Sequence, residues 1–558
     1  MIKRHLLLLF SLTLLSFPAF AAEADPPPAP EPAQAQSLLS NGDFSASTKT
    51  PGMPDDWGNL PAGVTRQEED GVYFLRFEST EPGKTVLLYR ALPLPTPRPP
   101  ALELRTKVRY QDIQPGSKPW FDGRIMANFK SADGKAVKGR YSAPAFRGTS
   151  KGWVERKVFF EIPEGAATLE LMPCLFQAKA GTLDIASIAI LPARADQVPP
   201  PPPPPPFYPS ETITPKDVTS LPPELRVQGN KIVTVAGKEI WLQGLCLDSM
   251  EWQARGEKLD KSIPVAIEEW KSNVIRLPVR DDFWFGAGPW QRKDWGGLDY
   301  RKEVDSVIAE AAKRGAYVVL DLHTFGAPVE HHAKFWKDAA VRYKNHPTVI
   351  FEIFNEPHSM SWKVWRDGGS LSGAENKGAV QATAENKLKQ SEDKVIGMQA
   401  LVDAVRSTGA RNIIVAGGLA WGYDISGILE GYALDDKGGN GIVYSTHVYP
   451  WKKDWQERFL NVAEKYPLFL GELGAPEKWS DFSFIPADER YEDLSKLEWP
   501  PDMLGLIQKH KLHWTGFSFH PRCGPMVISD WDYTPTPYWG IFVKEALAGK
   551  QFEMKRMR

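Results

Sequence analysis

The chain has 558 residues, long enough for two or more domains, and its 42% hydrophobic and 24% charged content is typical of globular proteins. The 67 basic and 69 acidic residues leave a net charge of −2, so we expect no basic face and no nucleic-acid partner. Three cysteines, Cys174, Cys246 and Cys523, are too few for a disulfide framework and lack metal-ligand spacing.

The N-terminus has the features of an export signal. A basic start, Met1 to His5, precedes an apolar run from Leu6 to Phe17, and Ala19-Phe20-Ala21 has the small-x-small form of a cleavage site. The alternative is a membrane anchor, but a run of about 12 residues is shorter than the roughly 20 that span a bilayer. We therefore predict a signal peptide at residues 1–22, a secreted or periplasmic protein, and no membrane attachment after cleavage.

The next region is predicted to be an all-β domain. Residues 23–36 are rich in Ala, Pro, Glu and Gln, which predicts disorder. From 37 to 193, short alternating runs such as Val72–Phe77 and Val86–Tyr89 are separated by Gly, Pro and Asp turns. This pattern predicts a β-sandwich.

A proline-rich linker is predicted at residues 194–222. It contains eight consecutive prolines, Pro199–Pro206, which favour an extended polyproline helix. At about 3.1 Å per residue this segment spans roughly 25 Å and holds two domains apart.

From residue 223 to 558 the pattern changes to strands that alternate with helices. The predicted strands are Ile240–Leu247, Asn273–Val279, Ala316–Leu322, Val349–Phe354, Asn412–Ala416, Ile442–Thr446, Leu468–Leu473 and Trp514–Phe519. Helical patterns lie between them, at Arg301–Arg314, Ala333–Lys344, Lys394–Ser407 and Trp455–Lys465. Eight such units predict an α/β fold, a (β/α)8 TIM barrel. The rival, a doubly wound sheet, lacks a Gly-rich phosphate turn here.

Polar residues follow most of the predicted strands, at the end where a barrel carries its active site. They are Arg276, Asp321, His323, Asn355, Glu356, His447, Tyr449, Glu472 and His520. Glu356 and Glu472 would face one another across the barrel mouth. Hydrolysis of an acetal needs such a pair, one protonated carboxyl and one carboxylate. A lone glutamate or histidine at a strand end is more often structural, so the prediction depends on the convergence of the whole set.

Six motifs carry a resemblance to a known family. GKEIWLQGLCLDSMEW, NVIRLPV, VVLDLHTF, VIFEIFNEP, IVYSTHVYP and LFLGELG occur in this order between about residues 230 and 546. The region resembles glycoside hydrolase family 5, the cellulase family. The resemblance implies a retaining mechanism without metal or cofactor, with Glu356 as acid/base and Glu472 as nucleophile.

The resemblance also implies roles for the neighbouring residues. Asn355 matches the residue that contacts the sugar 2-hydroxyl, Arg276 and Tyr449 match groups that hold the nucleophile, and His323 and His447 match groups that line the reacting subsite. The family commonly places a tryptophan at the end of strand eight as a floor beneath the sugar. We align Phe519 with it, and the alternative is that Trp514 or Trp531 fills this role.

The front domain has a second resemblance. LLSNGDF near its start and GTLDIASIAIL near its end are similar to the first and last strands of jelly-roll carbohydrate-binding modules. This resemblance implies polysaccharide binding by residues 37–193, with Asp184 as a candidate calcium ligand. The alternative is a domain that only stabilises the chain or spaces its parts.

Three features are left with alternatives. Tryptophans in predicted loops either bind sugar rings or pack in the core: Trp252, Trp284, Trp290, Trp295, Trp362, Trp365, Trp421, Trp451 and Trp531. Residues 359–393 either wall the cleft or are solvated. Cys246 and Cys523, on neighbouring strands, either stay as thiols, which we favour, or pair.

The sequence as a whole predicts a secreted, monomeric, retaining β-glycoside hydrolase that cleaves a β-linked polysaccharide. An endo-β-1,4-glucanase is the first expectation, and a β-mannanase or another β-glucanase the second. The alternative from another class is a non-catalytic polysaccharide-binding protein.

Overall fold

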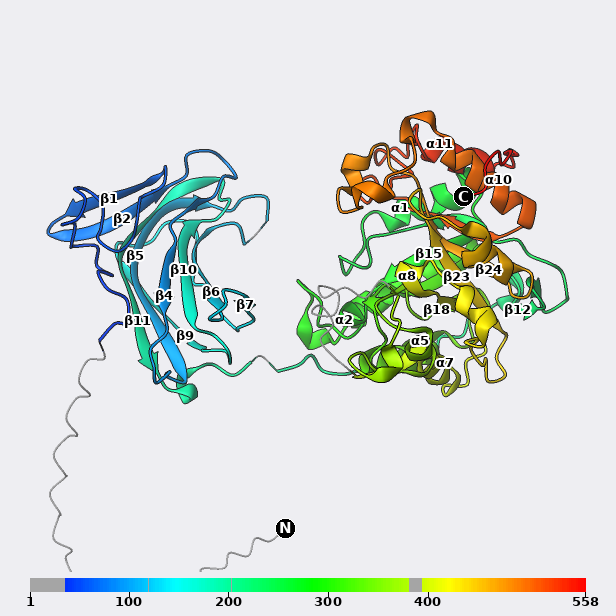
Figure 1. Ribbon diagram of the computed structural model, residues 1–558, viewed down its shortest axis with the longest axis horizontal. Helices are drawn as coiled ribbons and strands as arrows, with labels where there is room; N and C mark the ends of the chain where they lie inside the picture. Colours follow the sequence, from blue (N-terminus) through cyan, green and yellow to red (C-terminus); the bar gives the residue numbers. More distant parts are fainter. Residues whose placement is uncertain (1–35, 119, 202, 381–393) are drawn as a thin grey trace, which may run out of the picture. The chain divides into compact units, whose positions relative to one another are not determined.

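The computed structural model describes residues 36–118, 120–201, 203–380 and 394–558, and the chain divides into two compact units between residues 202 and 203 (Figure 1). The predicted signal peptide lies outside the described residues, as does the segment up to residue 35. In the described parts, no helix is both long enough and apolar enough to cross a membrane.

The first unit contains two antiparallel sheets, as the sequence predicts (Figure 1). One has the order β1 (Val64–Glu69), β2 (Val72–Glu78), β11 (Ala180–Ala193), β5 (Ala101–Gln114) and β9 (Val154–Glu161). The other has the order β3 (Val86–Leu87), β10 (Thr168–Leu175), β6 (Gly123–Lys130) and β7 (Ala136–Val137), and β4 (Arg90–Pro93) and β8 (Ala145–Phe146) pair with β10 and β6.

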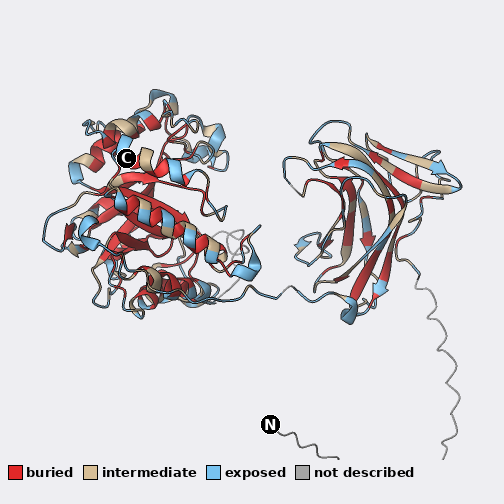
Figure 2. Ribbon diagram, turned by 180° about the vertical axis from the view of Figure 1, so that it is seen from behind, coloured by how far each residue is buried: buried red, intermediate tan, exposed pale blue. Residues whose placement is uncertain are grey.

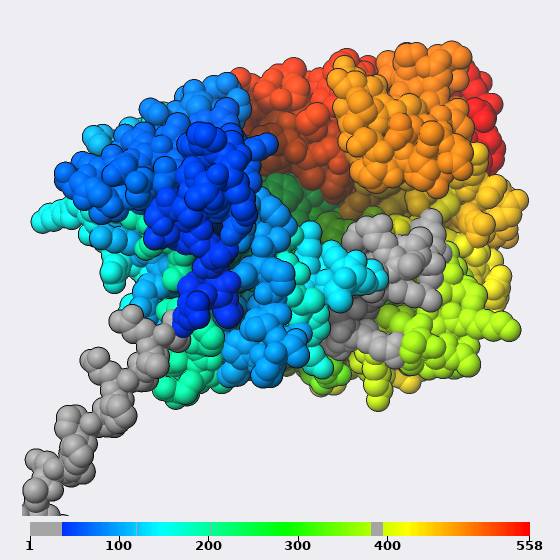
Figure 3. All heavy atoms as spheres, turned by 60° about the vertical axis from the view of Figure 1, so that its left-hand side comes forward, coloured from blue at the N-terminus to red at the C-terminus, as the bar shows by residue number. Residues whose placement is uncertain are grey.

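Alternation along the strands builds the core of this unit. In β5, Leu102, Leu104 and Val108 are fully buried in the core, while Arg105 between them is exposed. The segment before β1 joins the same core through Phe44 and Trp57, whose ring centroids lie 5.1 Å apart. In the space-filling view this dark blue segment lies directly against the strands that follow it (Figure 3).

The candidate calcium ligand Asp184 has a different role in the structure. Its Oδ1 accepts a hydrogen bond from Arg76 Nε at 2.7 Å, and its Oδ2 accepts bonds from Arg76 Nη2 at 2.8 Å and Arg109 Nη2 at 3.0 Å. Two guanidinium groups therefore occupy both carboxylate oxygens. This charge pairing takes the place of a cation, so the calcium assignment is wrong.

The spacer between the two units is shorter than the linker predicted at residues 194–222. From Tyr208 onward the chain binds the barrel unit: the Tyr208 carbonyl accepts a bond from Arg301 Nη1 at 2.7 Å, and Ser210 Oγ donates to Asp338 Oδ1 at 2.6 Å. The Ile213 amide continues this contact by donating to the Arg342 carbonyl. The residues after the prolines are thus part of the second unit.

The second unit is a closed barrel of eight parallel strands in chain order, which confirms the predicted fold. The strands are β14 (Gln243–Cys246), β15 (Val274–Val279), β16 (Tyr317–Leu322), β18 (Val349–Glu352), β22 (Ile414–Gly417), β23 (Ile442–Val448), β24 (Leu468–Leu473) and β25 (His513–Gly516). The burial colouring shows these strands at the buried centre of the unit (Figure 2).

A hairpin, β12 (Leu225–Gln228) with β13 (Lys231–Thr234), covers the amino-terminal end of the barrel. Leu225 and Ile232 pack there in one cluster with inward-facing residues of the barrel strands, such as Val274 and Ile350. The amide of Ile240 also pairs with this hairpin, which explains why β14 begins later than predicted. With this end filled, the carboxyl end is left for function.

Helices and short strands occupy the connections between the barrel strands. The helices are α1 (Leu259–Pro264), α2 (Asp281–Trp284), α3 (Leu298–Lys313), α4 (Glu330–Tyr343), α5 (Trp362–Asp367), α7 (Gly397–Arg406), α8 (Leu419–Gly422), α9 (Asn461–Ala463), α10 (Trp499–His510) and α11 (Gly540–Leu547), with π-helical turns at Val265–Glu269 and Gln456–Leu460. The short strands are β17 (Phe325–Gly326), β19 (Glu356–Pro357), β20 (Gly369–Ser370) and β21 (Lys394–Val395).

The long connection after β18 is partly structured. Within it, Trp365 on α5 is fully buried, and its indole N–H donates to the Gly417 carbonyl at 3.0 Å, so this part is neither solvated nor free of the barrel. Residues 381–393 lie outside the described residues.

The favoured expectation for the cysteines is confirmed, because Cys246 and Cys523 are both free thiols.

Candidate active site

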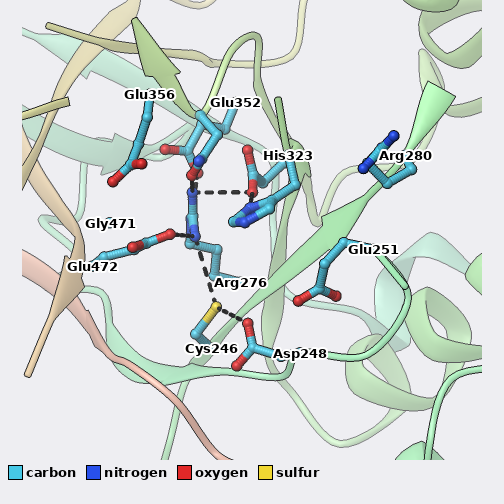
Figure 4. A network of polar contacts seen from close by, with 12 residues as sticks. Cys246, Asp248, Glu251, Arg276, Arg280, His323, Glu352, Glu356, Gly471 and Glu472 are labelled. Atoms are coloured by element: carbon cyan, nitrogen blue, oxygen red, sulfur yellow. Dashed lines mark hydrogen bonds and ion pairs between the residues drawn. The ribbon is translucent and has the colours of Figure 1, made fainter. Parts of the chain in front are cut away.

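The polar residues at the carboxyl ends of the strands converge on one guanidinium group, that of Arg276 on β15 (Figure 4). Nη1 donates to Glu472 Oε1 at 2.8 Å, Nη2 to Asn355 Oδ1 at 2.7 Å, and Nε to Glu352 Oε2 at 2.6 Å. Arg276 is fully buried, and Asp321 lies 3.0 Å from its Nη2. A buried cation held by three carboxylates is stable only as this whole network, which fixes its members in place.

Glu472 reaches the barrel mouth through an irregularity in β24. Leu470 pairs with Thr446, but the next pair is Glu472 with His447, so Gly471 is an extra residue on this strand. Such a bulge turns the following side chain to the other face. A Cβ on Gly471 would lie 2.8 Å from Ser445 Oγ and 3.1 Å from Glu352 Oε1, so only glycine fits here without displacement.

Glu472 is held as a carboxylate. Burial raises its pKa, but the cations His447 and Arg276 act more strongly in the other direction and lower it to about 2. Tyr449, after β23, donates its hydroxyl to Glu472 Oε2 at 2.6 Å and so fixes the orientation of the carboxylate. These contacts suit a group that must attack while charged.

Glu356 lies on the short strand β19, which extends the barrel edge beyond β18 by pairing with β17. Its Oε1 lies 3.0 Å from Nδ1 of the buried His447, and one of its carboxylate oxygens lies within 4.8 Å of an oxygen of Glu472. Burial opposes the charge on His447, but Glu472, Glu352 and Glu356 outweigh it and raise the pKa of His447 to about 10. A cationic imidazole therefore lies between the two carboxyl groups.

Asn355 and His323 complete the set that the sequence predicted. Arg276 holds Asn355 Oδ1, while Asn355 Nδ2 is buried without a hydrogen-bond partner among the described residues. His323 Nδ1 lies 2.7 Å from Asp321 Oδ2, and although burial opposes it, Asp321 raises the pKa of His323 to about 9. The site thus presents an amide donor and a second cation to a ligand.

Sequence reasoning missed Glu352 and named Asp321 only as a polar residue at a strand end, not as an acid inside the barrel. Glu352 and Asp321 are fully buried and pair with Arg276, and they lie two residues beyond the inward-facing Ile350 and Val319. Because side chains alternate along a strand, this spacing places both acids inside the barrel. An acid at an inward position of an otherwise apolar strand was the signal that could have identified them.

Two further acids, Asp248 and Glu251, follow β14 and lie beside the same network (Figure 4). Asp248 Oδ1 accepts a hydrogen bond from the Cys246 thiol at 3.4 Å, and its Oδ2 is buried without a partner among the described residues. Burial raises the pKa of Asp248 to about 7, with His323 opposing and Glu472 adding to the shift. Burial, with repulsion from Asp248, raises the pKa of Glu251 to about 8.

This arrangement predicts a pH-dependent stability for the barrel. Asp248 binds its proton more tightly in the folded protein than in the unfolded chain, where its pKa is about 3.9. The folded state therefore loses stability as pH rises from about 4 to about 7. The side chain of Asp248→Asn cannot ionise. As the pH rises through this range, we therefore expect the free energy of unfolding of this variant to increase by on the order of 4 kcal/mol relative to the wild type. The measurement is the free energy of unfolding of the barrel at several pH values, and a difference that does not change with pH would refute it.

The predicted sugar-binding role of Phe519 is wrong. Its side chain is 2% exposed and packs in the core, with ring centroids 5.1 Å from Trp270 and 5.5 Å from Tyr533. The strand ends at Gly516, earlier than predicted, and the chain then turns so that Phe519 faces inward to the core. Phe517, which directly follows the strand and is 8% exposed, is not part of that core among the described residues.

These positions predict opposite effects for the two rings. Phe519→Ala should destabilise the protein by about 3–5 kcal/mol and leave KM unchanged well below the melting temperature. Phe517→Ala should lower kcat/KM about tenfold, since one aromatic contact with a sugar is worth about 1 kcal/mol or more. Thermal unfolding and steady-state kinetics on both variants test this, and a normal kcat/KM for Phe517→Ala would exclude it as the floor.

Aromatic side chains surround the site on the loops that follow the strands. One group connects His323 to Phe325, Trp421 and His358, a second connects Tyr449 to Trp451, Trp479, Phe482 and Phe484, and a third contains Trp252, His520 and Trp531. Tyr449 and Trp451 are stacked with centroids 4.9 Å apart, and Phe484 at the outer end is 73% exposed. Of the tryptophans that the sequence places in loops, Trp284 and Trp365 are fully buried and pack in the core.

Comparisons with known proteins identify the family of the barrel region. The profile of the Cellulase family (glycosyl hydrolase family 5) matches residues 233–522. An endoglucanase of Paenibacillus polymyxa is 25% identical over 364 residues, which cover 56% of this chain and 85% of that protein. Endoglucanase E-5 of Thermobifida fusca is 23% identical over 312 residues, 53% of this chain and 55% of that protein, so the chain spans about half of its length.

Among solved structures, the β-glucanase SdGluc5_26A of Saccharophagus degradans is similar, with 24% identity, a TM-score of 0.46, and coverage of 61% of this chain and 97% of that chain. The family profile covers just over half of the sequence. The chain therefore belongs to glycosyl hydrolase family 5, the cellulase family, and is a glycoside hydrolase.

Proposed function

We propose that the protein is a retaining, endo-acting β-glucanase in which Glu472 is the nucleophile and Glu356 the acid/base. The observation that carries the proposal is the carboxylate pair, of which one oxygen from each residue lies within 4.8 Å of the other. Retaining glycosidases hold this pair about 5–5.5 Å apart, whereas inverting enzymes need roughly 6.5–9.5 Å to admit a water.

In the first step, Glu472 attacks the anomeric carbon, and Glu356 gives its proton to the leaving glycosidic oxygen. Arg276 and Tyr449 aim the attacking carboxylate through bonds to its two oxygens. The product of this step is a sugar esterified to Glu472 and a free chain end. The free Nδ2 of Asn355 can donate to the sugar 2-hydroxyl, where hydrogen bonds tighten in the transition state.

In the second step, Glu356 takes a proton from water, and the resulting hydroxide attacks the anomeric carbon and releases Glu472. Two displacements restore the original β configuration. Because Glu356 acts first as acid and then as base, it must exchange its proton, and the partly exposed position of its side chain supports this. His447, bonded to Glu356 and 3.6 Å from Glu472 Oε2, contacts both carboxyl groups throughout.

The aromatic groups around the mouth support an endo mode of action. The group at His323 begins beyond β16 and the group at Tyr449 begins at the end of β23, three strands further round the barrel. Sugar rings stack on aromatic faces, so a chain can be bound on both sides of the bond to be cleaved. A β-1,4-glucan is the proposed substrate, since the relatives are named endoglucanases.

A panel of polysaccharides tests this proposal. The purified protein should act fastest on β-1,4-linked glucan, and the viscosity of the solution should fall well before many reducing ends appear. A preference for mannan would show that the substrate is a mannan and not a glucan. Early release of short sugars at constant viscosity would show that the enzyme does not act in the endo mode. If no reducing sugar is released from any substrate, the barrel is a binding protein only.

We also propose that the chain acts outside the cytoplasm, which the basic start, the short apolar run and the Ala19-Phe20-Ala21 site support. A polymeric substrate cannot enter a cell, so an enzyme that cleaves it must be exported. N-terminal sequencing of the protein from the culture medium or periplasm should give a start near residue 23. An uncleaved N-terminus in the cytoplasm would contradict export.

A further inference from the structure

His447 and the two glutamates at the barrel mouth place three atoms that can bind a metal around one point. One atom from each of Glu356, His447 and Glu472 lies within 4.8 Å of the other two. His447 Nδ1 is 3.0 Å from Glu356 Oε1 and 3.6 Å from Glu472 Oε2. Ligands that bind Zn²⁺ tetrahedrally at about 2.0–2.2 Å lie roughly 3.3 Å apart, which falls between these two distances. The side chain of Glu356 is 14% exposed, so it has room to close the remaining gap to Glu472.

The surroundings of His447 suit a metal ligand. The imidazole is fully buried, and its Nε2 has no hydrogen-bond partner within the described parts of the chain. Glu352 Oε1 lies 3.9 Å from this nitrogen. A histidine that binds a metal through one nitrogen commonly donates its other N–H to a carboxylate, which fixes the orientation of the ring. Binding through Nδ1 would leave the proton on Nε2 and direct it at Glu352.

The balance of charge at the mouth also favours a dication. When Glu356 is ionised, four carboxylates and two cations surround His447, and these are Asp321, Glu352, Glu356 and Glu472 with Arg276 and His323. The remaining charge of about −2 is offset only in part by a proton on His447, whereas a divalent ion offsets it fully. At a given distance these carboxylates attract a dication with twice the Coulomb energy of a proton, so the ion can displace the proton to solvent.

We propose that Zn²⁺ binds to Glu356, His447 and Glu472 and inhibits the enzyme in competition with its substrate. Imidazole and carboxylate groups suit Zn²⁺, which keeps a fourth position for water in sites with three protein ligands. An ion held there engages both the attacking carboxylate and the proton donor, so the anomeric carbon is excluded. The ion is an inhibitor and takes no part in the reaction. Inhibition rests on the proposed roles of the two glutamates, whereas binding of the ion does not.

The test uses the full chain after treatment with a chelator. Calorimetry with Zn²⁺ should show a site that EDTA empties again. In steady-state kinetics on a soluble substrate, Zn²⁺ should raise the apparent KM and leave kcat unchanged, as expected of a competitor. Co²⁺ bound at the same site should give the strong visible absorption of a four-coordinate ion, and added Zn²⁺ should remove this absorption.

Two variants remove one ligand each. His447→Gln should weaken Zn²⁺ binding at least about a hundredfold, and Glu356→Gln at least about tenfold, because each leaves only two of the three ligands. Glu356 is partly exposed, so its variant keeps the test decisive if the buried His447→Gln does not fold. His331→Gln is the matched control, since this half-exposed histidine also lies near a carboxylate, 3.2 Å from Asp281, but outside the site. It should bind Zn²⁺ and be inhibited as the wild type is.

The inference is overturned if Zn²⁺ does not bind, if the two ligand variants bind it as tightly as the wild type, or if the apparent KM does not rise. Loss of binding in His331→Gln instead would place the ion on the surface and overturn it as well. A protein that binds Zn²⁺ through these ligands but cleaves no polysaccharide would refute the proposed function alone. An active enzyme that Zn²⁺ neither binds nor inhibits would refute this inference alone.

Discussion

Replacing Glu472 by alanine is expected to lower kcat at least about a thousandfold on every glycoside, because the side chain forms the covalent bond in the first step. Glu352 and Asp321 cannot take its place, since Arg276 holds both deeper in the barrel. Initial rates on a polysaccharide and on an aryl glycoside test this, with thermal unfolding as a check that the barrel remains folded.

Azide makes this test specific for the nucleophile. Azide is a small anion that fits the space vacated in Glu472→Ala, attacks from the same side, and leaves an α-glycosyl azide as the product. Glu352→Ala is the matched control, because this carboxylate also pairs with Arg276 but should give no such product. A Glu472→Ala enzyme with more than a tenth of wild-type activity, or a β-azide product from it, would contradict the assignment.

Replacing Glu356 by alanine is expected to have an effect that depends on the leaving group. A sugar hydroxyl leaves poorly unless it receives a proton, so activity on polysaccharide should fall about 10²–10⁴-fold. A dinitrophenolate leaves without a proton, so the first step on dinitrophenyl β-cellobioside should change less than tenfold.

Burst kinetics separate the two steps for this variant. Release of dinitrophenolate should begin with a fast phase and then slow, because the second step still lacks its base. Glu356→Gln is the control for shape, since it keeps the contact with His447 but cannot supply the same proton. Equal losses on polysaccharide and on the activated substrate would show that Glu356 is not the acid/base.

The barrel could be predicted from the sequence because each strand is a short apolar run and each helix a periodic one. Polar residues at the ends of these runs then fell at one edge of the sheet, and seven of the eight predicted site residues do lie together: Arg276, His323, Asn355, Glu356, His447, Tyr449 and Glu472. What made this possible is that a parallel barrel brings all strand ends to one face.

Details that depend on the path of the backbone could not be predicted in the same way. The extra residue at Gly471 turns Glu472 into the mouth, although alternation from the inward-facing Phe469 would place residue 472 on the outer side. The early end of β25 sends Phe519 into the core for a related reason. Asp184 was misassigned because its partners, Arg76 and Arg109, come from strands 108 and 75 residues away.

The central claim is that two displacements occur at one anomeric carbon, and the configuration of the first product tests it most directly. Proton NMR during the first minutes of cellohexaose hydrolysis, before the anomers interconvert, resolves the α and β signals of the new reducing end. The account predicts that the β anomer appears first and that the α anomer follows only by mutarotation. Initial appearance of the α anomer would show a single displacement by water and contradict the role of Glu472 as nucleophile.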